Sequence, residues 1–151
     1  MNRKRKILIM EDDVEASFLM QNFLDSCSYS VNCVETVTDG ISYLKNEQYD
    51  LLLLDLNLPD FSGLDLLSTI QNSITIPILV ISAYNDTETK IQAFKYGAID
   101  YITKPINFLE LEARVAAQLN RIENTNSSNK KINPIFNILT IKYYLKMKLY
   151  S

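Results

Sequence analysis

Short apolar runs alternate with amphipathic stretches along the first 122 residues, and each run ends in polar residues. Short bounded runs predict strands, and longer stretches with a period of about 3.6 residues predict helices. Strands are expected at about 6–10, 30–34, 50–55, 77–82 and 100–103. Helices are expected at about 14–27, 38–46, 63–72, 86–96 and 107–122. Such regular alternation predicts a parallel sheet that is covered by helices on both faces.

Residues at the expected helix starts agree with this pattern. Asp13 stands before the first helix as a candidate N-cap, where its carboxylate would accept a backbone N–H. Ser62 with Asp65 and Asn107 with Glu110 have the spacing of capping boxes. These signals place the loops between strand ends and helix starts, which is where ligands bind in open α/β sheets.

Right-handed crossover connections leave few arrangements for five such units, and the strand order 2-1-3-4-5 is the one expected. The predicted fold class is α/β, a flavodoxin-like (βα)5 doubly wound five-stranded parallel sheet. This order places the first and third strands side by side, so Glu11 and Asp12 become neighbours of Asp55. Ser82 and Lys104 follow the fourth and fifth strands and reach the same rim. Crowded carboxylates repel one another unless a cation lies among them, so this rim predicts a hard divalent metal ion.

Composition narrows the possible functions. A chain of 151 residues with 47% apolar and 22% charged residues is typical of one globular domain with a short appendage. No apolar run approaches the roughly 18 residues of a membrane span, so no membrane partner is expected. Histidine is absent, which excludes a Ser-His-Asp triad, a histidine general base and histidine-ligated zinc. Cys27 and Cys33 lack metal-ligand spacing and indicate reduced thiols, as in a cytoplasmic protein.

The composition changes after Ile122. Residues 124–131 are expected to form a polar linker, and residues 132–151 a basic tail with the period-two alternation of a strand. The net charge is −3 although five lysines and no acid follow residue 123, so the body is acidic, which does not suggest nucleic-acid binding. A tail of this length cannot bury a core alone, so it would be the start of a truncated effector domain. The alternative is a first domain that acts alone by docking on a partner.

Four motifs, each at a strand end, carry a family resemblance. They are Glu11-Asp12, Asp55-Leu56-Asn57-Leu58-Pro59 with Gly63, Ser82-Ala83, and Lys104-Pro105. Over about residues 5–122 the chain resembles the receiver domain of two-component response regulators, which gives a receiver domain at 1–123. The stretch Glu110-Leu111-Glu112-Ala113-Arg114-Val115 is most similar to the subfamily with winged-helix DNA-binding effectors. The resemblance implies a phosphorylation-activated switch rather than an enzyme, with transcription as its output and DNA contacted only through an effector domain.

The resemblance also implies the chemistry of the rim. Asp55 would accept a phosphoryl group from a phosphohistidine on a sensor histidine kinase or phosphotransfer protein. Mg²⁺ would be bound directly by Asp12, Asp55 and the backbone carbonyl of Asn57, with Glu11 acting through water. Asp60, in the same loop as Asn57, is taken as a solvated surface residue.

Further residues acquire roles from the same resemblance. Lys104 would pair with a phosphoryl oxygen, and the family keeps its peptide bond to Pro105 cis, which would aim the lysine inward. Ser82 would donate a hydrogen bond to another phosphoryl oxygen. Tyr101 resembles the switch aromatic, which turns inward when Ser82 moves to the phosphoryl group. Tyr84 occupies a position that borders the path of attacking water.

The fourth helix, fifth strand and fifth helix form a predicted dimer face. Its charged residues would pair across a two-fold axis once the domain is activated. They are Lys90, Asp100, Glu110 and Arg114. Ile99 and Tyr96 stand where the subfamily has acids, so fewer ion pairs are expected here. The alternative is an ordinary solvated charged face.

Two other function classes compete with a phosphorylated receiver. A pseudo-receiver would be a binding module that no longer takes phosphate, but the residues needed for phosphoryl transfer are all present. A haloacid-dehalogenase-like phosphatase also uses a strand-end aspartate and Mg²⁺. It carries a second aspartate two residues after the first, where this chain has Asn57.

Overall fold

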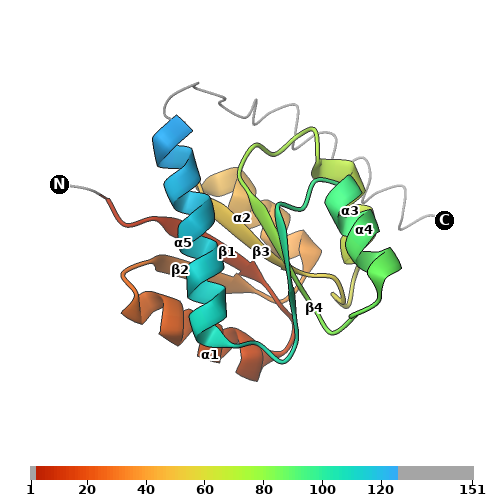
Figure 1. Ribbon diagram of the computed structural model, residues 1–151, viewed down its shortest axis with the longest axis horizontal. Coiled ribbons are helices and arrows are strands. Elements are labelled where there is room, and N and C mark those ends of the chain that lie inside the picture. The colour runs from red at the N-terminus through yellow and green to blue at the C-terminus, as the bar shows by residue number, and fades with distance from the viewer. Residues whose placement is uncertain (1–2, 126–151) are drawn as a thin grey trace.

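The computed structural model describes residues 3–125. They form a five-stranded parallel sheet of order β2-β1-β3-β4-β5 (Figure 1), which confirms the predicted flavodoxin-like topology. The strands are β1 (Lys6–Met10), β2 (Ser30–Val34), β3 (Leu51–Asp55), β4 (Ile78–Ser82) and β5 (Asp100–Thr103). The helices are α1 (Val14–Ser26), α2 (Val37–Asn46), α3 (Gly63–Ile70), α4 (Thr87–Lys95) and α5 (Phe108–Thr125).

Two apolar layers hold the helices against the sheet. β3 is buried along its whole length because helices cover both faces. Its side chains alternate, so Leu52 and Leu54 pack in the layer with α2, α3 and α4, whereas Leu51 and Leu53 pack in the layer with α1 and α5. Burying one leucine side chain stabilises the fold by about 2 kcal/mol. The strand that ends in Asp55 is therefore firmly held.

The helix ends agree with the sequence at most positions. The Asp13 carboxylate accepts the N–H of Ala16 at 3.2 Å, which confirms it as the N-cap of α1. Asn107 likewise accepts the N–H of Glu110 at 3.1 Å. Gly97 follows α4 with a φ of 101°, a left-handed conformation that glycine adopts without strain.

The predicted capping box at Ser62 is wrong. Ser62 precedes α3, but its side chain makes no capping hydrogen bond. Its backbone instead forms an isolated antiparallel bridge with Asn57, and the next N–H, from Gly63, donates to the Leu56 carbonyl at 2.9 Å. A Cβ on Gly63 would lie 2.4 Å from the Leu56 Cα, so only glycine permits this approach. Backbone pairing therefore sets the start of α3.

The structure also bears on the predictions for the cysteines, for membrane spans and for the linker. Cys27 and Cys33 are half-buried free thiols, and burial raises the pKa of Cys33. Within residues 3–125, no helix is both long enough and apolar enough to cross a membrane. α5 runs to Thr125, so its last residues lie in the stretch expected to be linker. The rest of that linker and the predicted tail at 132–151 fall outside the described residues.

Candidate functional site

The sheet topology brings together residues that are far apart in the sequence. β1 pairs with β3, so that Met10 lies opposite Leu54, and the residues that follow them are Glu11 and Asp55. β3 pairs with β4, and β4 with β5, whose register sets Ser82 opposite Thr103. Because parallel strands end at the same edge, these side chains converge on one rim of the sheet.

Three carboxylates meet at this rim. Oxygen atoms of Glu11, Asp12 and Asp55 all lie within 4.8 Å of one another. Glu11 is 1% exposed and Asp55 is 4% exposed, whereas Asp12 is open to solvent. Hard divalent cations prefer carboxylate oxygens and keep water on their open side. The donor set and its one exposed member therefore fit a Mg²⁺ ion.

Lys104 supplies the one ammonium group in contact with the cluster among the described residues. Its Nζ donates to Glu11 at 2.6 Å and to Asp55 at 2.9 Å. The peptide bond between Lys104 and Pro105 is cis, as the resemblance implied. The two hydrogen bonds show that the lysine points into the site, where it partly offsets the charge of the acids.

The electrostatics show an excess of negative charge. Burial, together with hydrogen bonding to Asp55, raises the pKa of Glu11 to about 7. Burial disfavours the ionised form of Asp55 too, but its hydrogen bonds with Glu11, the Asn57 N–H and Lys104 hold its pKa below the usual value. Burial would lower the pKa of Lys104, but its bonds to the two acids raise it. Asp55 is therefore the more acidic member of the buried pair.

The orientation of Asp55 is fixed on both oxygens. Oδ1 accepts the Asn57 N–H at 2.9 Å, and Oδ2 accepts the Lys104 ammonium at 2.9 Å. The Asn57 bond also ties the carboxylate to the β3–α3 loop, defined as residues 56–62. A carboxylate held in this way keeps its lone pairs aimed into the rim, as a positioned nucleophile requires.

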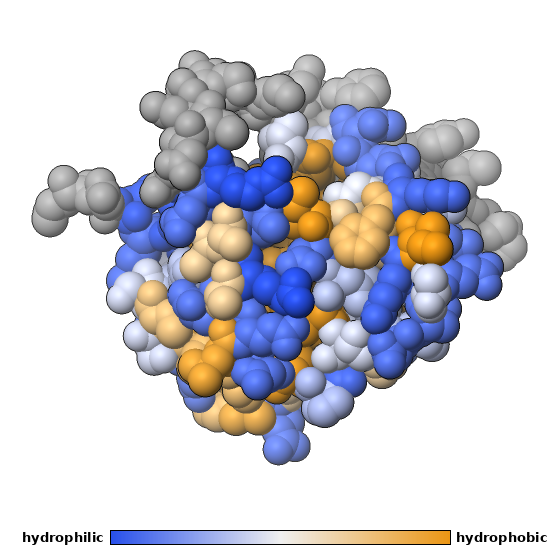
Figure 2. Space-filling model, in the orientation of Figure 1, coloured by the Kyte–Doolittle hydropathy of each residue, from blue (hydrophilic) through white to orange (hydrophobic). Residues whose placement is uncertain are grey.

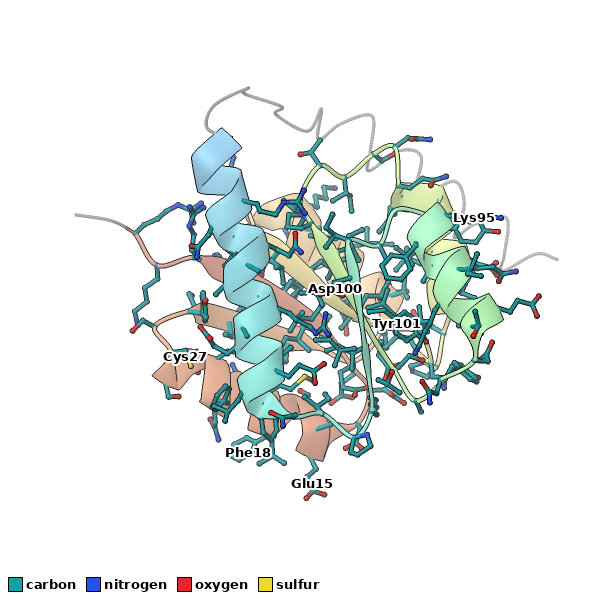
Figure 3. All side chains as sticks on the ribbon, in the orientation of Figure 1. Glu15, Phe18, Cys27, Lys95, Asp100 and Tyr101 are labelled. Carbon is teal, nitrogen blue, oxygen red and sulfur yellow. The ribbon has the colours of Figure 1, made fainter. Side chains whose placement is uncertain are left out.

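Ser82, Tyr84 and Tyr101 form a chain of hydrogen bonds beside the cluster. Ser82 is fully buried, and its Oγ accepts the Tyr84 N–H at 3.0 Å. The Tyr101 hydroxyl donates to the Tyr84 carbonyl at 2.7 Å, and the residue is 8% exposed. Tyr101 therefore lies inward, between β5 and the β4–α4 loop (Figure 3). Lys90 of α4 lies 5.8 Å from its ring centre, within cation–π range.

In the predicted dimer face, the basic side chains form hydrogen bonds with residues of the same chain. One guanidinium nitrogen of Arg114 donates to both Asp100 oxygens, at 3.0 and 2.9 Å, and another donates to Glu110 at 3.1 Å. Lys90 donates to Asn85 at 2.9 Å rather than reaching Glu110. Figure 2 shows this face, where charged side chains separate apolar patches. Its role in a dimer stays a prediction.

Sequence reasoning missed the role of Asp60. Its carboxylate accepts the backbone N–H groups of Val37 and Thr38, at 2.9 and 3.0 Å, and also the Thr38 hydroxyl. Asp60 is exposed, as predicted, but it also binds the first residues of α2, which the sequence did not indicate. Local spacing rules connect a cap to its own helix, and here the cap comes from a loop more than twenty residues later in the chain.

A cavity of about 390 Å³ opens between the β3–α3 loop and Tyr84.

Comparison with known proteins agrees with the fold. Residues 7–116 match the response regulator receiver domain family. The chain is 38% identical to the regulatory protein VanRc of Enterococcus gallinarum, over 82% of this chain and 53% of that protein. It is 40% identical to the transcriptional regulatory protein KdpE of Staphylococcus aureus, over 87% of this chain and 55% of that protein. The chain thus spans about half the length of these curated relatives.

Solved structures show the same likeness. A two-component response regulator from Clostridium difficile superposes with a TM-score of 0.77 at 31% identity, covering 82% of this chain and 100% of that one. A CheY-like receiver domain from Methanospirillum hungatei gives 0.77 at 27% identity, covering 82% and 99%. With the topology, the acidic rim and the family match in agreement, the chain belongs to the response regulator receiver domain family.

Proposed function

We propose that this chain is a phosphorylation-driven switch in which Asp55 accepts a phosphoryl group from a phosphohistidine. The observation that supports this most directly is the surroundings of Asp55. It is 4% exposed, lies within 4.8 Å of two further carboxylates and bonds Lys104 at 2.9 Å. An ionised, oriented carboxylate beside a lysine is suited to form the new P–O bond as the P–N bond breaks and the imidazole leaves.

The remaining rim residues have distinct tasks in this proposal. Asp12, Asp55 and the Asn57 carbonyl would hold Mg²⁺, with Glu11 supporting it through water. The ion would supply positive charge to offset the phosphoryl oxygens. Lys104 would transfer one of its hydrogen bonds from the acids to a phosphoryl oxygen. The proximity of the three carboxylates and the bonds of Lys104 and the Asn57 N–H to Asp55 support this assignment.

Ser82 and Tyr101 would report the modification to the surface. Ser82 now accepts the Tyr84 N–H, and Tyr101 bonds the Tyr84 carbonyl, so both contact the same loop residue. When Ser82 donates to a phosphoryl oxygen, the loop after β4 shifts and the α4–β5–α5 face changes with it. Beryllofluoride, a phosphoryl analogue, should therefore change amide exchange across residues 83–104.

The proposal extends to partners and to the rest of the protein. The phosphoryl donor would be a sensor histidine kinase or a phosphotransfer protein in the cytoplasm. KdpE is a transcriptional regulatory protein by name, and this chain covers 55% of it. We therefore propose a transcriptional output through an effector domain that follows residues 124–131, with the tail at 132–151 as its start. DNA would be contacted only by that effector.

The experiment that tests the proposal is phosphorylation by a small donor. The parent, incubated with Mg²⁺ and acetyl phosphate, should gain the mass of one phosphoryl group, and peptide mapping should place it on Asp55. Asp55→Asn should gain none. The matched control is Asp50→Asn, which alters an aspartate at the other end of the sheet and should leave labelling intact. Full labelling of Asp55→Asn would rule out this assignment.

A further inference from the structure

Asp60 connects two elements that each border the rim. It lies at the tip of the β3–α3 loop, and its carboxylate bridges to the first residues of α2. Oδ1 accepts the Val37 N–H at 2.9 Å, while Oδ2 accepts both the N–H and the hydroxyl of Thr38 at 3.0 Å. These contacts use both oxygens of the side chain, although the residue itself is exposed.

The N-terminus of α2 depends on this contact. The first backbone N–H groups of a helix have no partner within the helix. The Thr36 hydroxyl accepts the Asp39 N–H at 3.1 Å, which satisfies one of them. Asp60 accepts the two before it, and its negative charge lies at the positive end of the helix dipole. Thus α2 and the loop each stabilise the position of the other.

The loop is closed at its base and attached at its tip. At the base, Asn57 bridges Ser62, and the Gly63 N–H donates to the Leu56 carbonyl at 2.9 Å. At the tip, Asp60 bonds α2. Asn57 belongs to the base, and its own N–H holds Asp55 at 2.9 Å. Only Leu58 and Pro59 separate Asn57 from Asp60, so movement of the tip would be passed to the peptide unit that carries the Asn57 carbonyl.

We propose that Asp60 is a positioning residue for the metal site, because it fixes the β3–α3 loop that presents the Asn57 carbonyl. This inference rests on the proposed function, in which that carbonyl is a Mg²⁺ ligand. Mg²⁺ demands near-ideal octahedral geometry with short metal–oxygen distances. A carbonyl that moves by a fraction of an ångström binds it less well, although no ligand has been removed. Asp60 thus acts on the metal site indirectly: it binds α2, and this contact holds the loop that carries Asn57.

The test measures Mg²⁺ affinity by calorimetry in four variants of the full chain. Asp60→Ala removes the tether, and Asp60→Asn keeps an acceptor oxygen without the charge. Thr36→Ala removes the third bond at the same helix end but leaves the loop alone. Asp39→Asn removes one exposed charge from that helix end. Partners that orient metal ligands typically contribute about tenfold or more in affinity.

We expect Asp60→Ala to weaken Mg²⁺ binding by about tenfold and Asp60→Asn by less. The Mg²⁺ affinities of Thr36→Ala and Asp39→Asn should stay within about twofold of the parent's. Thr36→Ala should nevertheless lower the melting temperature, because it removes a helix cap. A second readout is the amide resonance of Leu58, whose N–H shares a peptide unit with the Asn57 carbonyl. Mg²⁺ should shift it strongly in the parent and weakly in Asp60→Ala.

The outcomes separate the two proposals. If Mg²⁺ leaves the Leu58 resonance of the parent unmoved, Asn57 is not a ligand, and the metal site proposed above is wrong as well. If the parent responds and Asp60→Ala responds equally, with equal affinity, the metal site stands and the positioning role is overturned. Equal losses in Asp60→Ala and Thr36→Ala would trace the effect to the stability of α2 and would also overturn it.

Discussion

The two ends of the parallel sheet differ in the ratio of acidic to basic side chains. At the amino end, the Asp50 carboxylate accepts the Lys6 N–H at 2.7 Å and binds Arg3 at 2.8 Å, with Arg5 at 3.7 Å. Glu47 pairs with the Lys6 ammonium. Acids there are matched or outnumbered by bases, and every one of these contacts closes within the chain.

At the carboxyl end the balance is reversed. Within the described residues, Glu11 and Asp55 share the ammonium group of Lys104, and Asp12 adds a third carboxylate within 4.8 Å of theirs. Two of these acids are almost completely buried, so solvent cannot disperse their charge. A matched cluster is complete without a ligand, whereas an unmatched one gains free energy from any cation it admits. This difference supports a structural role for the amino end and the proposed chemistry for the carboxyl end.

The largest effect should come from removing the exposed acid. Asp12→Ala should abolish detectable Mg²⁺ binding, because it deletes a proposed direct ligand from a site with few protein ligands. Without metal it should also melt slightly higher, since carboxylate repulsion is relieved. Calorimetry and thermal unfolding check both effects, with Glu15→Ala as a control for loss of one exposed charge in α1. Parent-like Mg²⁺ affinity in Asp12→Ala would place the site elsewhere.

Removing the base should produce a smaller effect that depends on pH. Glu11 has a pKa of about 7 in the folded protein against an ordinary 4.5, so the folded state binds more protons in that window. Stability therefore falls as the pH rises from about 4.5 to 7. Lys104→Met removes the group that opposes this shift, and the window should extend upward. We expect Lys104→Met to lower the free energy of unfolding by about 2–3 kcal/mol at pH 8 and by less at pH 6. This figure allows for solvent screening, because the Lys104 side chain is 26% exposed.

Urea unfolding at the two pH values, with and without Mg²⁺, measures this difference. Mg²⁺ should restore part of the lost stability in Lys104→Met because it replaces the missing positive charge. Lys95→Met, at an exposed position in α4, is the matched control and should be insensitive to pH and metal. A loss that is equal at pH 6 and pH 8 would show that the ammonium does not compensate the buried acids.

The sequence was sufficient for the fold because apolar periodicity determines it locally. All five strands begin and end within one residue of the predicted positions, and the alternation with helices set the topology. The rim followed from that topology, since parallel strands must end together. Ser62 shows the limit of local rules. Its spacing to Asp65 suggested a capping box, but backbone pairing with Asn57 took its place.

Contacts between elements were harder to predict from the sequence. Asp60 reaches a helix that precedes it by more than twenty residues, and no spacing rule links an acid to a distant helix end. The partners of Arg114 illustrate the same difficulty. The sequence showed complementary charges but could not decide between pairing within one chain and pairing across two. The structure has Arg114 bonded to Asp100 and Glu110 of its own chain.

At the amino end, Asp50→Ala should lower stability by about 1–2 kcal/mol. It removes the acceptor of a backbone N–H at the start of β1, while the ion pair with the exposed Arg3 contributes little. Because this cluster is balanced within the chain, Mg²⁺ should not change the loss. Denaturant titration with and without metal measures it, and Asp50→Asn should recover part of the stability. A loss that Mg²⁺ reverses would contradict the division between the two ends of the sheet.

The smallest effect is expected from the charged residues of the predicted dimer face. Arg114 already bonds Asp100 at 2.9 Å in its own chain, so pairing across a dimer would exchange one contact for another. Such an exposed exchange is worth about 0–1 kcal/mol, which is at most about fivefold in the dissociation constant. Phe94 is 48% exposed on α4, and burying its ring in the contact would contribute more. With beryllofluoride bound, sedimentation should show a weak dimer with modest salt sensitivity. Arg114→Ala should weaken it less than fivefold, and Phe94→Ala should weaken it more. A parent that stays monomeric would rule out the dimer, and a loss above tenfold in Arg114→Ala would show that its intrachain pairing is abandoned on activation.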